Sequence, residues 1–346
     1  MYVIIAILIF GILIAIHEFG HFITAKLCGV RVLEFSIGMG PLLWSRQGEE
    51  TAYSLRLLPI GGFCAMEGED TASDDPRAFN NQNPLKKILI LAAGAGMNFL
   101  LGFLLIVAVL TVGHGQTPEI TAFMEGCPYE GEDALQVGDV FWKIDGHRIY
   151  VTADVSMYLA DGDTHDLVVK RDGETVTLEN MTLTKREYPG ETQLRYGFYF
   201  GAQVSGVGET LRYSWYQSLY YVRSVWDSLR GLVSGMYGVN DLSGVVGIVD
   251  LMSDVGHQSA SAFYAFLNLA NLSAFIAINL AVMNLLPIPA LDGGRIFFLI
   301  VLWPVEKILG RKLDPKYEGY VHTVGLMLLM ALMIYVTLHD VIRIFG

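Results

Sequence analysis

The pentapeptide H-E-F-G-H, from His17 to His21, contains residue types that bind and use a metal ion. Two histidines four residues apart lie on one face of a helix, where both imidazoles can bind one zinc ion. Glu18 is placed between them to deprotonate a zinc-bound water, whose pKa falls to about 7. The spacing therefore predicts a hydrolytic Zn2+ centre with His17 and His21 as ligands and Glu18 as the catalytic base.

The motif lies inside an apolar stretch, residues 2–27, which is long enough to span a bilayer. Ionisable groups at that depth are costly and usually functional, so an idle group of hydrogen-bonded core histidines is the weaker interpretation. A cleaved signal peptide is a second alternative. The stretch has no basic residues at its start and no small-residue cleavage site, which argues against it.

The whole composition is that of a membrane protein. The chain has 346 residues, is 53% hydrophobic and 17% charged, and has a mean hydropathy of +0.43. Four apolar stretches reach the length of about 20 residues that a bilayer core requires. They lie near residues 2–27, 86–112, 262–288 and 320–341. We therefore predict a polytopic α-helical membrane protein with four transmembrane helices, with the lipid bilayer as its environment.

Lysine and arginine predict the orientation, because cytoplasmic loops carry an excess of them. They are frequent between the first two stretches and between the last two. Both loops should be cytoplasmic, with both termini and the long segment 113–260 outside. That segment is acidic in a chain of net charge −12, which argues against nucleic acid as a partner.

The chain divides into eight predicted segments. These are 1–34 with the first transmembrane helix and H-E-x-x-H; 35–84 with a cytoplasmic-side β-hairpin and loop; 85–114 with the second transmembrane helix; 115–204, a small β-rich extracytoplasmic domain; 205–260, an extracytoplasmic helix and linker; 261–295 with the third transmembrane helix; 296–319, a cytoplasmic-side segment; and 320–346 with the fourth transmembrane helix.

Two of these segments have alternative interpretations. The apolar positions between residues 211 and 233 recur at helical spacing, which predicts either a helix lying on the outer leaflet or a plain amphipathic packing helix. Residues 35–63 form two extended runs around a polar turn, with a sharp bend at Gly61 and Gly62. Their apolar character favours a hairpin against the membrane, although an ordinary packed hairpin is equally compatible.

A third zinc ligand must lie at the depth of the histidines. The third stretch ends in N-L-L-P-I-P-A-L-D-G-G-R, residues 284–295, where two prolines break the helix and Asp292 follows in a glycine-rich turn. The first and third stretches run in the same direction, so both end near the cytoplasm. Asp292 is the best candidate, and His322 at the inner end of the fourth stretch remains an alternative.

Together these motifs resemble the site-2 protease family of intramembrane zinc metalloproteases, most closely its bacterial RseP/RasP type with one PDZ domain. A-G-A-G-M-N at 93–98 and L-S-G-V-V-G-I at 242–248 resemble further segments of that family. A-L-Q-V-G-D-V-F-W-K-I-D-G at 134–146 resembles a PDZ run, which implies a PDZ-like α+β domain. Ala95 stands where the family has proline, and Ala134 where it has glycine.

The resemblance implies roles for individual residues. It makes His17, His21 and Asp292 the ligands and Glu18 the base. It also makes Asn279 and Asn284 candidates for holding the substrate backbone, although interhelical hydrogen bonding is another common use of asparagine in membranes. The hairpin, with Gly61 and Gly62, would be membrane-associated and would pair with substrate as an added strand.

The implied function is a zinc endopeptidase of the bacterial cytoplasmic (inner) membrane that cleaves single-span transmembrane proteins. Its substrates would be anti-sigma factors already cut by a site-1 protease, or signal-peptide remnants. The PDZ-like domain would either exclude uncut proteins or recruit substrate. A membrane PDZ receptor or scaffold with a non-catalytic metal site is an alternative, which Glu18 argues against. A zinc transporter would need further intramembrane ligands.

Overall fold

The four expected spans are present as helices. The computed structural model describes residues 2–69, 73–113, 115–201, 203–238, 241–309 and 315–345. Four helices are long and apolar enough to cross a bilayer: Tyr2–Leu27, Pro84–Gly113, Ala262–Asn284 and Gly319–Ile344. The third ends at Asn284 rather than near residue 288, because Pro287 and Pro289 lack the N–H that a continuing helix requires.

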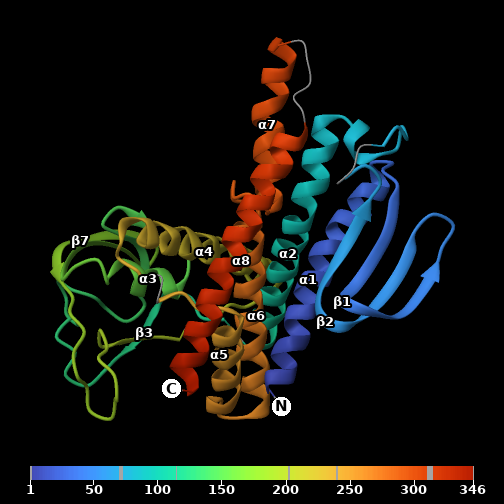
Figure 1. Ribbon diagram of the computed structural model, residues 1–346. Helices are drawn as coiled ribbons and strands as arrows, with labels where there is room; N and C mark the ends of the chain where they lie inside the picture. The colour runs from blue at the N-terminus through green and yellow to red at the C-terminus, as the bar shows by residue number, and fades with distance from the viewer. Residues whose placement is uncertain are drawn as a thin grey trace. The chain divides into compact units, whose positions relative to one another are not determined.

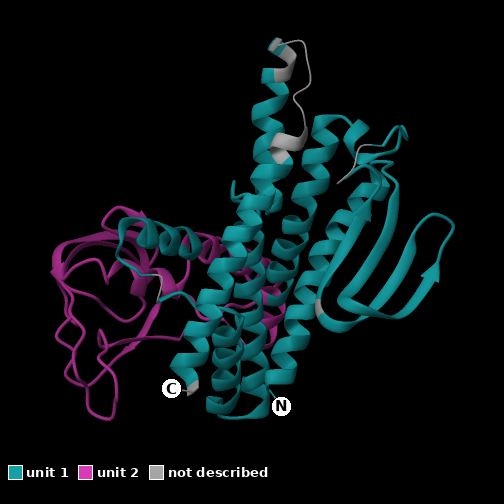
Figure 2. Ribbon diagram, viewed as in Figure 1, with its two compact units in different colours: residues 1–105, 224–346 teal, residues 106–223 magenta. Residues whose placement is uncertain are grey.

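The chain separates into two units, coloured in Figure 2. The first contains residues 1–105 and 224–346, and the second contains residues 106–223. The first unit holds α1 (Tyr2–Leu27), β1 (Val32–Gln47), β2 (Ala52–Met66), the 3-10 turn η1 (Phe79–Asn81), most of α2 (Pro84–Gly113), α5 (Val245–Gln258), α6 (Ala262–Asn284), α7 (Asp292–Leu309) and α8 (Pro315–Phe345).

An apolar core joins α1, α5 and α6, which lie side by side in Figure 1. Its buried members are Ala6, Leu13, Met252, Leu269, Ile276 and Ala277. Helix α5 was not expected from the sequence. The run Asp292–Leu309 forms a helix longer than the apolar segment 296–303 would require; its predicted place at the cytoplasmic surface stays a prediction.

A buried carboxylate on α8 fixes the start of α5. The Asp340 side chain is fully buried, and its Oδ2 accepts hydrogen bonds from the backbone N–H groups of Gly244 at 2.8 Å and Gly247 at 2.9 Å. The first N–H groups of a helix have no partner within the helix, and a negative charge is stabilised there. Asp340 therefore caps α5 from a different helix and explains why the segment around residues 242–248 is ordered.

The strands β1 and β2 form an antiparallel hairpin that bends back on itself beside α1 (Figure 1). Ser36 lies opposite both Phe63 and Ser54, so the first part of β1 is flanked on each side by a part of β2. Gly61 has φ +94°, a left-handed value that favours glycine at such a bend. The hairpin is longer at both ends than residues 35–63.

A second buried cluster connects this hairpin to the helices. It contains Ala25, Val30, Val32, Cys64, Met66, Phe79, Ile90 and Leu91, which come from the end of α1, the hairpin, the turn η1 and the start of α2. The cluster holds the end of β2 against α1. This packing matters for the site, because His17 and His21 lie on the same half of α1.

The second unit is an α+β arrangement around its own core. It contains β3 (Ile120–Phe123), β4 (Val140–Ile144), β5 (His147–Arg148), α3 (Thr152–Tyr158), β6 (Thr164–Arg171), β7 (Glu174–Thr182), β8 (Phe198–Phe200) and the first half of α4 (Val207–Ser234). The strands form a sheet of order β5-β4-β6-β7 and a separate pair β3-β8. Phe141, Ile144 and Leu167 lie at its centre.

Charged contacts hold this unit together from inside. Arg171 donates to both carboxylate oxygens of Asp139 at 2.8 Å, and the Asp139 side chain is fully buried. On α4, Arg223 donates to Asp154 Oδ1 at 2.8 Å, which ties that helix to α3. Helix α4 covers the region expected to be helical; its position on a membrane surface stays a prediction, as does the PDZ identity of the unit.

Candidate metal centre

Three side chains from two distant segments converge to form a metal-binding geometry. His17 Nε2 lies 3.1 Å from His21 Nε2 and 3.1 Å from Asp292 Oδ2, and His21 Nε2 lies 3.3 Å from the same oxygen. Ligands placed tetrahedrally about 2.0–2.1 Å from a zinc ion are about 3.3 Å apart. Within the described part of the chain, Asp292 Oδ2 is buried and accepts no hydrogen bond. Such an oxygen, facing two imidazole nitrogens, fits a cation between them.

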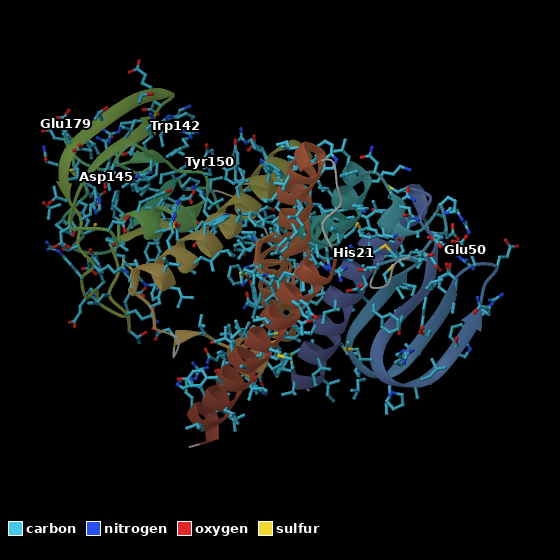
Figure 3. The ribbon with its side chains drawn as sticks, turned by 45° about the horizontal axis from the view of Figure 1, so that its top comes forward. His21, Glu50, Trp142, Asp145, Tyr150 and Glu179 are labelled. Atoms are coloured by element: carbon cyan, nitrogen blue, oxygen red, sulfur yellow. The ribbon has the colours of Figure 1, made fainter. Side chains whose placement is uncertain are left out.

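His21 is fixed in the tautomer that a metal requires. Its Nδ1 lies 2.9 Å from the carbonyl oxygen of Ile90 on α2, so this nitrogen carries the proton and donates it. The Nε2 lone pair then points toward His17 and Asp292. Metal-binding histidines usually donate their second ring N–H in this way, which orients the ring and increases its basicity. Figure 3 labels His21 on α1 beside the hairpin.

Asn284 performs a similar task for His17. Its side-chain amide lies 3.5 Å from His17 Nδ1. A histidine that binds metal through Nε2 carries its proton on Nδ1, so the amide must present its oxygen, which a half-turn of the amide group achieves. Asn279 is half-buried on the same helix, about 140° around its axis and about 7.5 Å along it from Asn284. The two asparagines therefore point in different directions.

Helix α2 lies directly against the two imidazoles at Gly94. A Cβ atom at this position would lie 2.5 Å from His21 Nε2 and 2.7 Å from His17 Cε1. Glycine is needed here because any side chain would occupy the space of the two imidazole rings. Gly94 lies in the A-G-A-G-M-N run, but its contact with the histidines was not predicted from the sequence. Its signal was the run of small residues, Ala92 to Gly96, within an apolar helix.

The loop before α7 places Asp292. Its backbone has an unusual shape: Ala290 has φ +76°, which is rare for a residue with a Cβ atom. The Ala290 N–H donates to His322 Nδ1 on α8 at 3.0 Å. His322, the alternative third ligand, therefore contacts the loop backbone. Among the described residues, the group that could hold a metal is His17, His21 and Asp292.

Glu18 lies beside the bend of the hairpin. It is half-buried, and a Cβ atom at Gly62 would lie 3.5 Å from its Cγ and 2.8 Å from the carbonyl oxygen of Ser36. Gly61 precedes this position and packs against Met39. Of the two glycines predicted to bind substrate, Gly62 therefore lies next to the predicted base, and its lack of a side chain leaves space beside Glu18.

The family model of peptidase family M50 matches residues 5–332. The chain belongs to peptidase family M50. A Clostridium acetobutylicum protein, whose name provisionally describes it as a zinc metalloprotease, is 38% identical over 343 residues, covering 98% of this chain and 97% of that protein. The zinc metalloprotease RasP of Bacillus licheniformis is 28% identical, and the regulator of sigma-W protease RasP of Bacillus subtilis is 27% identical; each alignment covers 98% of both chains.

These matches identify the enzyme class of this chain and its cofactor. It is a zinc metalloprotease of the site-2 protease family and a multi-pass membrane protein. The matched region includes the pentapeptide at residues 17–21 and the loop that carries Asp292. The His-His-Asp geometry is thus present in a chain whose relatives are named for zinc.

Proposed function

We propose that this M50 peptidase cleaves single-span membrane proteins within the bilayer, near the cytoplasmic end of their transmembrane segment. The observation that supports it is the position of the His-His-Asp group: His17 and His21 lie inside α1, a helix apolar enough to span a membrane, and Asp292 at the start of α7 meets them there. From Tyr2 to His17 the helix rises about 22 Å, in a hydrocarbon core about 30 Å thick. With the N-terminus outside, the site lies nearer the cytoplasm.

The proposed chemistry assigns one task to each residue. His17, His21 and Asp292 hold the zinc ion, which supplies a water of lowered pKa and polarises the scissile carbonyl. Glu18 accepts the proton of the attacking water and delivers it to the nitrogen of the leaving amine. Asn284 keeps the His17 ring oriented, and this fixed orientation holds its Nε2 toward the other two ligands.

The hairpin provides a surface for an unwound substrate. Residues 62–66 pair on one side with residues 32–37, and no described strand pairs with their other side. A helical substrate must unwind before its peptide bonds can be attacked, and its backbone groups then need new partners in lipid. An added strand along residues 62–66 supplies them. Because Gly62 has no side chain, such a strand can approach Glu18.

Exposed apolar side chains support a hairpin that contacts lipid. They include Ile37, Met39, Leu42, Leu43, Trp44, Leu55, Leu57 and Leu58. We propose a bacterial cytoplasmic membrane location, with both termini and residues 115–204 outside, as the distribution of basic residues predicts. Substrates of the anti-sigma-factor kind, first cut by a site-1 protease, accord with the sigma-W regulator name of the Bacillus subtilis relative.

Glu18→Gln tests this function. The purified protein is reconstituted in liposomes with a single-span peptide, and cleavage products and zinc content are measured together. The amide cannot accept the proton, so cleavage falls by about 10²- to 10⁴-fold while zinc is retained. Glu49→Gln makes the same change at an exposed hairpin position and leaves activity unchanged. A wild-type protein that binds zinc without cleaving would favour the receptor alternative.

A further inference from the structure

We propose that His322 is a positioning residue for the zinc centre, because it holds the backbone of the loop that carries Asp292. His322 Nδ1 accepts the backbone N–H of Ala290 at 3.0 Å. Ala290 is two residues before the proposed ligand. His322 acts here through the proposed zinc site, on which this role depends, and it does not itself touch the metal or the substrate.

The contact with His322 completes the hydrogen bonding of the loop. The N–H groups of Leu286, Ile288 and Leu291 donate to nearby backbone carbonyls, whereas that of Ala290 donates to the His322 side chain. Pro287 and Pro289 have no N–H group, so Ala290 carries the first donor after the second proline. At φ +76° this alanine is in a left-handed conformation, which is unfavourable for a residue with a Cβ atom. Such a conformation persists only where its surroundings determine it. The hydrogen bond to the His322 imidazole is one such surrounding contact, and it is made by Ala290 itself.

A second contact on the same face of α8 acts on the same loop. Gly325 follows His322 by three residues and therefore lies on the same side of the helix. A Cβ atom at Gly325 would overlap the ring of Pro289 and would lie 3.1 Å from its carbonyl carbon. The helix thus meets Pro289 with its backbone and Ala290 with its histidine. Two independent contacts define where the loop sits.

The next residues transmit that position to the ligand. Asp292 opens α7, and the N–H of Gly294 donates to Leu291 O at 3.0 Å. A Cβ atom at Gly294 would lie 2.9 Å from the carbonyl carbon of Ile288, so this turn packs on the loop without an intervening side chain. A shift at Ala290 is therefore not absorbed by flexible side chains before it reaches Asp292.

Substitutions at His322 test this positioning role, because they change where residue 322 places its hydrogen-bond acceptor for the Ala290 N–H. In His322→Asn the amide oxygen occupies roughly the place of Nδ1 and still accepts the Ala290 N–H. In His322→Gln it lies farther out, near the place of Nε2, and in His322→Phe no acceptor remains. Losing one hydrogen bond should weaken zinc binding roughly three- to tenfold. Val324→Phe places the same ring at an exposed position of α8 and serves as the matched control.

Zinc affinity is measured by competition with a chelator, on full-length protein in detergent. A second measurement replaces zinc with Co²⁺, whose visible absorption reports ligand geometry independently of cleavage. The role predicts wild-type affinity and spectrum for His322→Asn and Val324→Phe, with weaker binding and an altered spectrum for His322→Phe and His322→Gln. If phenylalanine prevents folding, the asparagine–glutamine comparison alone decides.

Equal affinity in all variants would overturn the positioning role, and so would equal weakening by asparagine and glutamine. A wild-type protein that binds no zinc would instead contradict the metal centre itself. The two failures are therefore distinguishable in one set of measurements.

Discussion

Gly94→Ala should separate helix stability from metal binding. The added Cβ atom would lie 2.5 Å from His21 Nε2 and 2.7 Å from His17 Cε1. Ordinary contacts between heavy atoms are about 3.5 Å, so the two rings must retreat by about 1 Å. Zinc sites tolerate deviations of only about 0.2 Å in ligand distance. His21 cannot yield freely, because the Ile90 carbonyl holds its other nitrogen.

The expected result is zinc binding at least about 100-fold weaker, because changes outside the ligand set alone cost 10- to 100-fold. Cleavage should be lost in parallel. Alanine favours the helix by about 0.5–1 kcal/mol over glycine, whereas crowding against the two rings typically costs about 1–3 kcal/mol, so the metal-free protein should unfold at a similar or modestly lower temperature.

Gly96→Ala is the matched control. Gly96 is exposed on the same helix, and a Cβ atom there would meet nothing within 4 Å. Metal content, chelator competition and unfolding temperature are measured for both variants. If Gly94→Ala binds zinc and cleaves like Gly96→Ala, then α2 does not lie against the two imidazoles.

Three further changes have defined outcomes. Asp292→Ala should lose most of the bound zinc together with activity, as metal analysis will show; full stoichiometry would place the third ligand elsewhere, with His322 tested next. Deleting residues 115–204 should spare the zinc site and permit cleavage of a substrate with a folded outer domain; uniformly slower cleavage with a raised KM would show recruitment instead. Burial opposes a charge on His165, but its hydrogen bonds to Asp145 at 2.6 Å and to the Gly162 carbonyl raise its pKa above the ordinary value. The pair therefore contributes its full stabilisation at mildly acidic pH and loses it as the pH rises through the raised pKa of His165. Thermal unfolding of the wild type and of His165→Gln should show a difference in stability that becomes smaller as the pH rises.

The spans and the convergence of His17, His21 and Asp292 were predictable because their signals are local or follow from topology. Four apolar stretches identify the helices, and the i, i+4 spacing of His17 and His21 identifies the metal face. Asp292 could be reached because two prolines mark the end of a span that runs in the same direction as the first. Each step used only chain direction and helix periodicity, which the sequence contains.

The rest depends on contacts between distant residues. Helix α5 is capped by Asp340, which lies 96 residues after Gly244, so no local signal marks its start. Gly94 looks like any glycine in an apolar helix until the histidines are placed beside it. His322 has a side chain that can bind zinc, and its place at the inner end of the fourth span matches the depth expected for the third ligand. Only the position of the Ala290 N–H shows that it contacts backbone.

The fourth span is attached by polar contacts near both ends. His322 binds the loop that carries Asp292, and Asp340, eighteen residues later, binds the start of α5. The rise between them is about 27 Å, close to the thickness of a hydrocarbon core. The residues between are mostly apolar and exposed, and so face lipid. In a thinner bilayer this helix must tilt, and the tilt acts on both attachments. If Asp292 is a zinc ligand as proposed, its carboxylate is linked through His322 to membrane thickness, and we expect cleavage to depend on lipid acyl-chain length.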